Sequence, residues 1–89
     1  MDEADRVWEL VKEAYLAQLG RTAYGHWGIG ESYVCVSQGD KLHVTMRDKY
    51  AAQWMTRLQL VARRALVAID SEYTRVYFYA EKETRYVAR

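Results

Sequence analysis

The sequence predicts an α+β domain with the element order ααββαβ, in which helices pack on one face of a three-stranded sheet. Some stretches carry apolar residues at helical spacing, others alternate apolar and polar residues as strands do, and glycines separate several of them. A chain of 89 residues has room for one hydrophobic core. We expect residues 1–80 to form this domain and the charged residues 81–89 to fray or to begin a linker.

The first third of the chain predicts two helices that meet at a glycine. Residues 5–19 contain no Gly or Pro, and their apolar side chains recur on adjoining turns: Val7, Val11, Ala14 and Tyr15. Gly20 is a good helix end, and a short second helix over residues 22–27 stops at Gly28-Ile29-Gly30. Trp8 lies beside the apolar stripe, so we expect its ring to project from the edge of the core, and Lys12 to face solvent.

The middle of the chain predicts a β-hairpin. Residues 32–37 are rich in Tyr and Val, residues 41–46 alternate apolar and polar side chains, and Gly39-Asp40 supplies the turn. We expect one buried face, with His43 solvated on the other. Residues 75–80 alternate in the same way and predict a third strand that pairs with the hairpin.

Between the hairpin and the third strand, the sequence predicts one long helix that begins at Asp48 and ends near Ile69. Its apolar side chains follow helical spacing: Tyr50, Trp54, Leu58, Val61, Ala65 and Ile69. An aromatic pair four residues apart shares one helical face, and we expect Trp54 in the core and Tyr50, near the helix start, as the better candidate for contact with a partner.

The charge balance, the single cysteine and the lack of a long apolar run argue against several classes of function. The 13 basic and 12 acidic residues leave a net charge of +1, which is too balanced for the strong phosphate attraction of a dedicated nucleic-acid binder. The single cysteine, Cys35, cannot form an internal disulfide, and no apolar run suggests a membrane span or a signal peptide. We therefore expect a cytoplasmic protein.

We expect neither catalysis nor a bound metal or other cofactor. The serines lack a nucleophile elbow, and no Walker motif is present. His26, His43 and Cys35 are candidate soft metal ligands, but none has zinc-site spacing to another. These features favour a docking module over an enzyme.

Several of these residues together resemble the N-terminal domain (domain I) of the bacterial chromosomal replication initiator DnaA. The matching features are Trp8, Tyr24-x-x-Trp27, the hairpin GDKLHVTM and the helix RDKYAAQWMTRLQLVARRAL. The resemblance covers roughly residues 6–80 and implies a fold similar to a type II KH domain. It also implies a protein-interaction domain, associated with the nucleoid, that forms weak homodimers, helps to load the replicative helicase and receives regulatory proteins of initiation.

The resemblance assigns roles to individual residues. Trp8 matches the self-association position, and Tyr50, which follows Lys49, matches an aromatic position that contacts the helicase. Ala23 occupies the position just before the aromatic residue of the second predicted helix, which the family also uses for helicase contact. The chain departs from the family pattern at Ala23, where an acidic residue is common, and at residues 28–30, where a Pro commonly follows Trp27. The resemblance therefore supports the fold more strongly than the helicase contact.

Two other interpretations stay open. In the first, the chain is a KH-like module that binds single-stranded DNA weakly, with exposed Tyr33, Tyr77 or Tyr79 stacking on bases. Its basic flank is made by Arg47, Arg57, Arg63 and Arg64. Gly25-His26-Trp27-Gly28 matches the GxxG pattern of KH domains, although Trp27 is more useful in the core than beside a phosphate. In the second, the chain is a free-standing regulator that mimics the initiator domain and occupies its partners.

Overall fold

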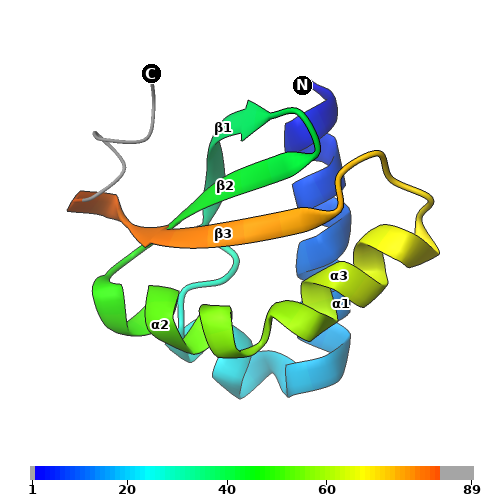
Figure 1. Ribbon diagram of the computed structural model, residues 1–89. Coiled ribbons are helices and arrows are strands. Elements are labelled where there is room, and N and C mark those ends of the chain that lie inside the picture. The colour runs from blue at the N-terminus through cyan, green and yellow to red at the C-terminus, as the bar shows by residue number, and fades with distance from the viewer. Residues whose placement is uncertain (1, 83–89) are drawn as a thin grey trace.

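The computed structural model describes residues 2–82 and confirms an α+β fold (Figure 1). Its elements, in chain order, are α1 (Glu3–His26), β1 (Tyr33–Gln38), β2 (Lys41–Met46), α2 (Lys49–Arg57), α3 (Gln59–Ala68) and β3 (Arg75–Ala80). The helix α1 crosses one face of the sheet, and α2 and α3 pack beside β3, as Figure 1 shows. Most of the predicted charged tail, residues 83–89, lies outside the described residues.

Helix α1 consists of two helical segments that meet at Gly20, as the sequence predicts. The side chain of Asp2 caps the helix start by accepting a hydrogen bond from the backbone N–H of Asp5 at 2.9 Å. Gly20 has φ 85° and ψ 166°, a conformation that residues with a Cβ avoid, so the chain changes direction there. With the bend at Gly20 counted, and with α2 and α3 taken together as the helical connection between β2 and β3, the order of elements agrees with ααββαβ.

The hairpin and the third strand form a mixed sheet in the order β1-β2-β3. Strands β1 and β2 are antiparallel, with a bulge between Val34 and Val36, and Gly39 takes φ 57° in the turn. Strand β3 runs parallel to β2, from Lys41 opposite Arg75 to Met46 opposite Ala80. This parallel pairing is what the helical connection between the two strands allows.

The prediction of one long helix between β2 and β3 is wrong. Asp48 does begin it, because its carboxylate accepts a hydrogen bond from the backbone N–H of Ala51 at 2.9 Å. At Leu58, however, φ is −103° and ψ is 23°, and the chain divides into α2 and α3. The hydroxyl of Tyr15 donates a hydrogen bond to the carbonyl of Leu58 at 3.0 Å, which satisfies a polar group at the break.

The hydrophobic core lies where α1, α2 and α3 meet the sheet. Its largest fully buried side chains come from every part of the chain: Trp8, Tyr15, Ile29, Leu42, Met46, Met55 and Leu66. Trp8 packs against Phe78 of β3 and against Tyr15, with ring centroids 5.9 and 6.3 Å away. Within the described part of the chain, no helix combines the length and the apolar character needed to cross a membrane.

Candidate protein interface

Trp8 is not the exposed anchor that the sequence suggests. Its side chain is 1% exposed, and its indole Nε1–H donates a hydrogen bond to Oγ of Ser32 at 3.0 Å. Trp8 lies four residues after Ala4 and seven before Tyr15, which places it in the buried stripe of α1. The ring therefore offers no surface to a second copy of the chain, and the prediction of an indole projecting from the core is wrong.

Lys12 is also buried, contrary to the solvent-facing position that we expect from the sequence. Its ammonium group donates hydrogen bonds to the carbonyls of Gly30 and Ser32 at 3.1 and 3.4 Å and pairs with Glu9 at 2.6 Å. Ser32 Oγ in turn donates to the carbonyl of Ile29. Together with the Trp8 hydrogen bond, these contacts fix the loop between α1 and β1 against the first half of α1, so Trp8 and Lys12 have structural roles.

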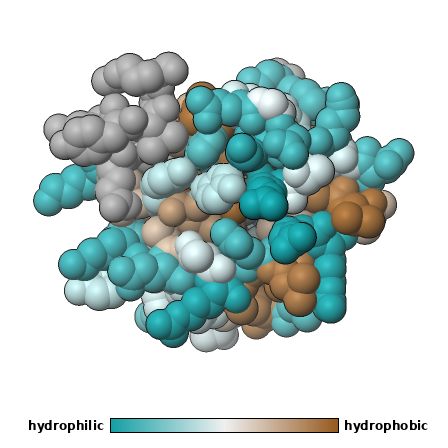
Figure 2. All heavy atoms as spheres, viewed as in Figure 1, coloured by the Kyte–Doolittle hydropathy of each residue, from teal (hydrophilic) through white to brown (hydrophobic). Residues whose placement is uncertain are grey.

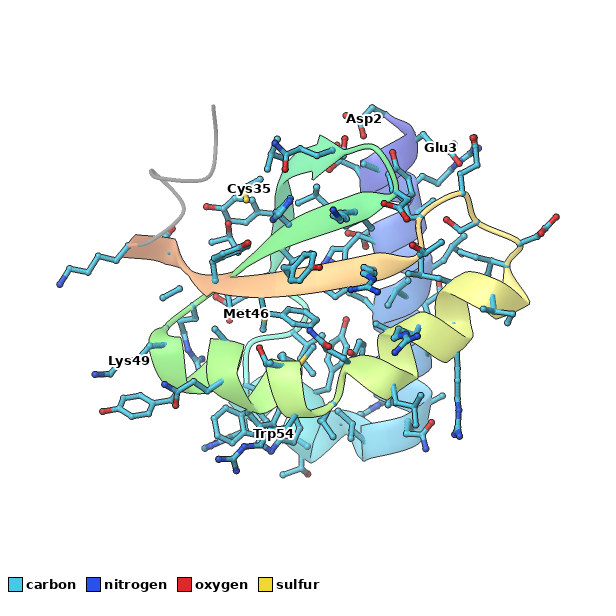
Figure 3. The ribbon with its side chains drawn as sticks, in the orientation of Figure 1. Asp2, Glu3, Cys35, Met46, Lys49 and Trp54 are labelled. Carbon is cyan, nitrogen blue, oxygen red and sulfur yellow. The ribbon has the colours of Figure 1, made fainter. Side chains whose placement is uncertain are left out.

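An exposed group of aromatic side chains lies where the end of α1 meets α2. We call this surface the aromatic corner and define it by the following residues: Ala23, His26, Trp27, Lys49, Tyr50 and Trp54. Tyr50 is 63% exposed, and the Lys49 ammonium lies 5.3 Å from its ring centroid. Figure 3 places Trp54 on the side of α2 that faces the second segment of α1, whereas Lys49 extends outward from the start of α2.

Two stacked rings form the base of the aromatic corner. The indoles of Trp27 and Trp54 are half-buried and nearly parallel, with centroids 4.7 Å apart and an angle of 15° between their planes. His26 meets Trp27 edge-on at 4.7 Å. Trp54 is predicted in the core, and its inner side does pack against core residues, but its half exposure makes it part of the surface as well.

The sequence-predicted partner residues come from two helices on either side of the stacked indoles, with Lys49 and Tyr50 at the start of α2 and Ala23 near the end of α1. Tyr50 is one turn before Trp54 on α2, and Ala23 is one turn before Trp27 on α1, where its carbonyl accepts a hydrogen bond from the Trp27 N–H at 3.1 Å. Ala23 is half-buried and contributes no charge. The corner therefore presents aromatic rings, a residue type that is enriched at protein–protein interfaces, with the positive charge of Lys49 at its rim.

The four predicted basic residues do not form one flank. The guanidinium of Arg47 donates to the carbonyl of His26 and lies 3.7 Å from the carboxylate of Asp48, so it joins the start of α2 to the end of α1. The other three lie on the exposed surface at the end of α2 and along α3: Arg57, Arg63 and Arg64. The arginines thus serve two separate surfaces.

The tyrosines predicted to stack on bases, Tyr33, Tyr77 and Tyr79, lie on the outer strands of the sheet. Tyr77 is half-buried and lines a hollow of about 100 Å³ with Arg63 and Arg75, which is where an arginine of the basic flank meets a predicted stacking ring. Tyr77 and Tyr79 both contact His43, by stacking and by a hydrogen bond. Tyr33 is 47% exposed at the start of β1, and the register places it and Tyr79 on either side of Thr45. The three rings therefore lie on the sheet face that carries His43, and Tyr77 is the one that lines a hollow with an arginine of the predicted basic flank, Arg63.

The prediction that His43 is solvated is wrong. Its side chain is 7% exposed, stacks on Tyr77 with centroids 5.4 Å apart, and has hydrogen bonds to Tyr79 at 2.9 Å and to Gln38 at 3.2 Å. Burial, and secondarily the positive charge of Lys41, lower the pKa of His43 below its ordinary value. The imidazole is thus a neutral packing element of the sheet.

The candidate metal ligands belong to separate environments. Cys35 is half-buried and donates from Sγ to the carbonyl of His43 at 3.2 Å, while His26 is at the aromatic corner. Within residues 2–82, no group of three His, Cys, Asp or Glu side chains converges as a metal site.

Sequence reasoning missed two exposed apolar residues of α3, Leu60 and Val67, which are 53% and 80% exposed. Their separation of seven residues, with Arg64 between them, is the signal that indicates an apolar row on one helical face.

No protein-family model matches the chain, and no curated protein is significantly similar to it.

Proposed function

We propose that this chain is a protein-interaction module that binds its partner through the aromatic corner. The observation that carries the proposal is Tyr50, which is 63% exposed beside the half-buried stack of Trp27 and Trp54. A rigid ring with few rotatable bonds loses little entropy when a partner covers it, and aromatic side chains are enriched among interface hot spots. The stacked indoles hold the surface beside Tyr50 in one shape before any partner arrives.

The resemblance to the initiator domain suggests the identity of the partner. Tyr50, Ala23 and Lys49 occupy its helicase-contacting region, so we propose a replicative helicase as the partner and recruitment at a replication origin as the role. A neutral Ala23 removes the charge contribution that an acidic residue makes there, so binding depends more on the rings. A dissociation constant of tens to hundreds of micromolar, or roughly 5–6 kcal/mol, is sufficient when many copies gather at one site.

A binding titration of the purified chain with the replicative helicase from the same genome tests this proposal. We expect Tyr50→Ala to weaken binding by about tenfold or more, because it removes a ring of the corner that is 63% exposed. Leu10→Ala is the matched control, since Leu10 is a 43% exposed apolar residue in the first half of α1. Equal loss in both variants contradicts the location of the site, and absence of binding by the unmodified chain contradicts the helicase as partner.

A further inference from the structure

Helix α3 presents a second surface that the aromatic corner does not include. A groove of about 460 Å³ runs between α1 and the α2–α3 pair, with an apolar lining from Ala14, Leu58, Leu60 and Val61 and with Arg57 and Arg64 at its sides. Figure 2 shows brown, hydrophobic side chains gathered among teal ones at the lower right, over α3. We call this surface the basic groove.

The apolar part of the basic groove continues along α3. Leu60 and Val67 line an adjoining hollow with Arg63 and Arg64, and this hollow measures about 370 Å³. Because Leu60, Arg64 and Val67 are spaced four and three residues apart, they share one face of the helix. A row of aliphatic side chains with guanidinium groups on its flanks complements an amphipathic helix, whose apolar residues recur at the same spacing.

The charges of the groove have no acidic partner within the chain that the structure describes. Among residues 2–82, the ion pairs join Glu3 to Arg6, Glu9 to Lys12 and Asp48 to Arg47. The arginines of the groove are all exposed and take part in none of these pairs: Arg57, Arg63 and Arg64. Three unpaired guanidinium groups around an apolar centre select a ligand that carries carboxylates, which Arg binds in bidentate fashion.

We propose that the basic groove binds an acidic amphipathic helix of another protein. Helix α3 has ten residues and is about 15 Å long, so it matches roughly three turns of a ligand helix. The apolar face of that ligand would cover Leu60 and Val67, and its glutamate or aspartate side chains would reach the flanking arginines. The residues that line this surface are not those of the aromatic corner, although Arg57 follows Trp54 by one turn of α2.

The lining of the groove favours a peptide over a single-stranded nucleic acid. Single strands bind mainly by stacking bases on aromatic rings beside basic side chains. The described residues that line the basic groove and its adjoining hollow include no aromatic side chain. Two tyrosines lie in neighbouring hollows that share Arg63, namely Tyr77 and Tyr73, and neither ring lines the basic groove itself.

The proposal can be tested with a synthetic helix of roughly 15 residues that carries leucines on one face and glutamates elsewhere. Titration into the ¹⁵N-labelled chain should shift the amide signals of α3 and the facing part of α1, but not those around Tyr50. A matched peptide with every glutamate replaced by glutamine should bind at least about tenfold more weakly, because the carboxylate–guanidinium contacts are lost. Equal binding of the two peptides overturns the proposal.

Charge reversal in the protein provides the complementary test. Arg64→Glu should weaken binding of the acidic peptide by about tenfold or more. Arg21 is an exposed arginine on α1 outside the groove, so Arg21→Glu should leave the affinity for the peptide unchanged. Circular dichroism of both variants checks that each is folded. Equal affinity of Arg64→Glu and the unmodified chain overturns the proposal.

A fluorescent oligothymidine supplies the competing ligand. If it binds more tightly than the acidic peptide, loses affinity steeply with salt and depends on Arg64, then the surface is a nucleic-acid site and the proposal is wrong. If the oligothymidine fails to displace the peptide at equal concentration, the result supports the peptide as the occupant.

Discussion

The indole rings of Trp27 and Trp54 stack with centroids 4.7 Å apart, and this contact joins the end of α1 to the middle of α2. Neither ring is fully buried, so each serves both the packing of two helices and the surface on which Tyr50 stands. Arg47 reinforces the same junction by donating to the carbonyl of His26. The shape of the aromatic corner therefore depends on the packing of α1 against α2.

Replacing Trp54 should lower the stability of the domain. We expect Trp54→Ala to reduce the free energy of unfolding by about 2–3 kcal/mol, because it removes the stack and the inner packing of a half-buried indole. Trp54→Phe is the control, since it keeps an aromatic ring against Trp27 and should cost about half as much or less. Urea denaturation measures both values, and an unchanged midpoint for Trp54→Ala would show that the stack contributes nothing.

Breaking the hydrogen bond beneath Trp8 should also destabilise the chain. In Ser32→Ala, the buried indole N–H of Trp8 loses its acceptor, which costs about 1–3 kcal/mol. Ser37→Ala at the exposed end of β1 is the matched control and should change stability by less than about 0.5 kcal/mol. Thermal or urea unfolding distinguishes the two, and equal stabilities would contradict a structural role for the Trp8–Ser32 bond.

Two glycines of α1 should respond to alanine in opposite directions. Gly20 has φ 85° and ψ 166°, so Gly20→Ala strains the backbone by about 1–3 kcal/mol although no atom crowds the added methyl group. Gly25 is helical with open space around it, so Gly25→Ala should stabilise the helix by about 0.5–1 kcal/mol. Unfolding midpoints that move in the same direction for both variants would contradict the bend at Gly20.

Stability should fall in mildly acidic solution because of His43. The pKa of its imidazole is lowered in the folded chain, mainly by burial, so the unfolded chain binds more protons as the pH falls through the ordinary value of 6.5. Stability is thus greatest above that value and declines below it. His43→Gln removes this titration, so its stability should change less between about pH 7.5 and pH 5.5. Parallel stability curves for the two proteins would contradict the burial of a neutral imidazole.

Local sequence signals predicted the boundaries that have local causes. Asp48 before α2, Gly20 within α1 and Gly39 in the hairpin each act through their own backbone or cap, so residue type alone indicates them. The alternation of residues 75–80 likewise predicted β3. These features account for the correct α+β class and order of elements.

The errors arose where distant residues decide the outcome. The break at Leu58 coincides with a hydrogen bond from Tyr15, 43 residues earlier, and nothing near Leu58 in the sequence marks it. The position of Trp8 directly after Val7 predicts a place at the edge of the apolar stripe, yet both residues face the core on a helix whose buried face is wide. Lys12 is buried because the carbonyls of the loop before β1 approach it, which helical spacing does not reveal.

The candidate site could be predicted in part. Exposure of Tyr50 follows from its place near a helix start, and the structure agrees. The stack of Trp27 on Trp54 joins residues 27 positions apart, so sequence spacing could not pair them. The basic groove likewise requires knowledge of how α1 lies beside α3.

The chain contains three tryptophans, and their indole N–H signals in a ¹H–¹⁵N correlation spectrum test the central claim most directly. On addition of the replicative helicase, we expect the Trp27 and Trp54 signals to shift or broaden, because both rings belong to the aromatic corner. The Trp8 signal should stay in place, because its N–H is buried against Ser32. A change confined to Trp8, with Trp27 and Trp54 unaffected, would contradict binding at the aromatic corner.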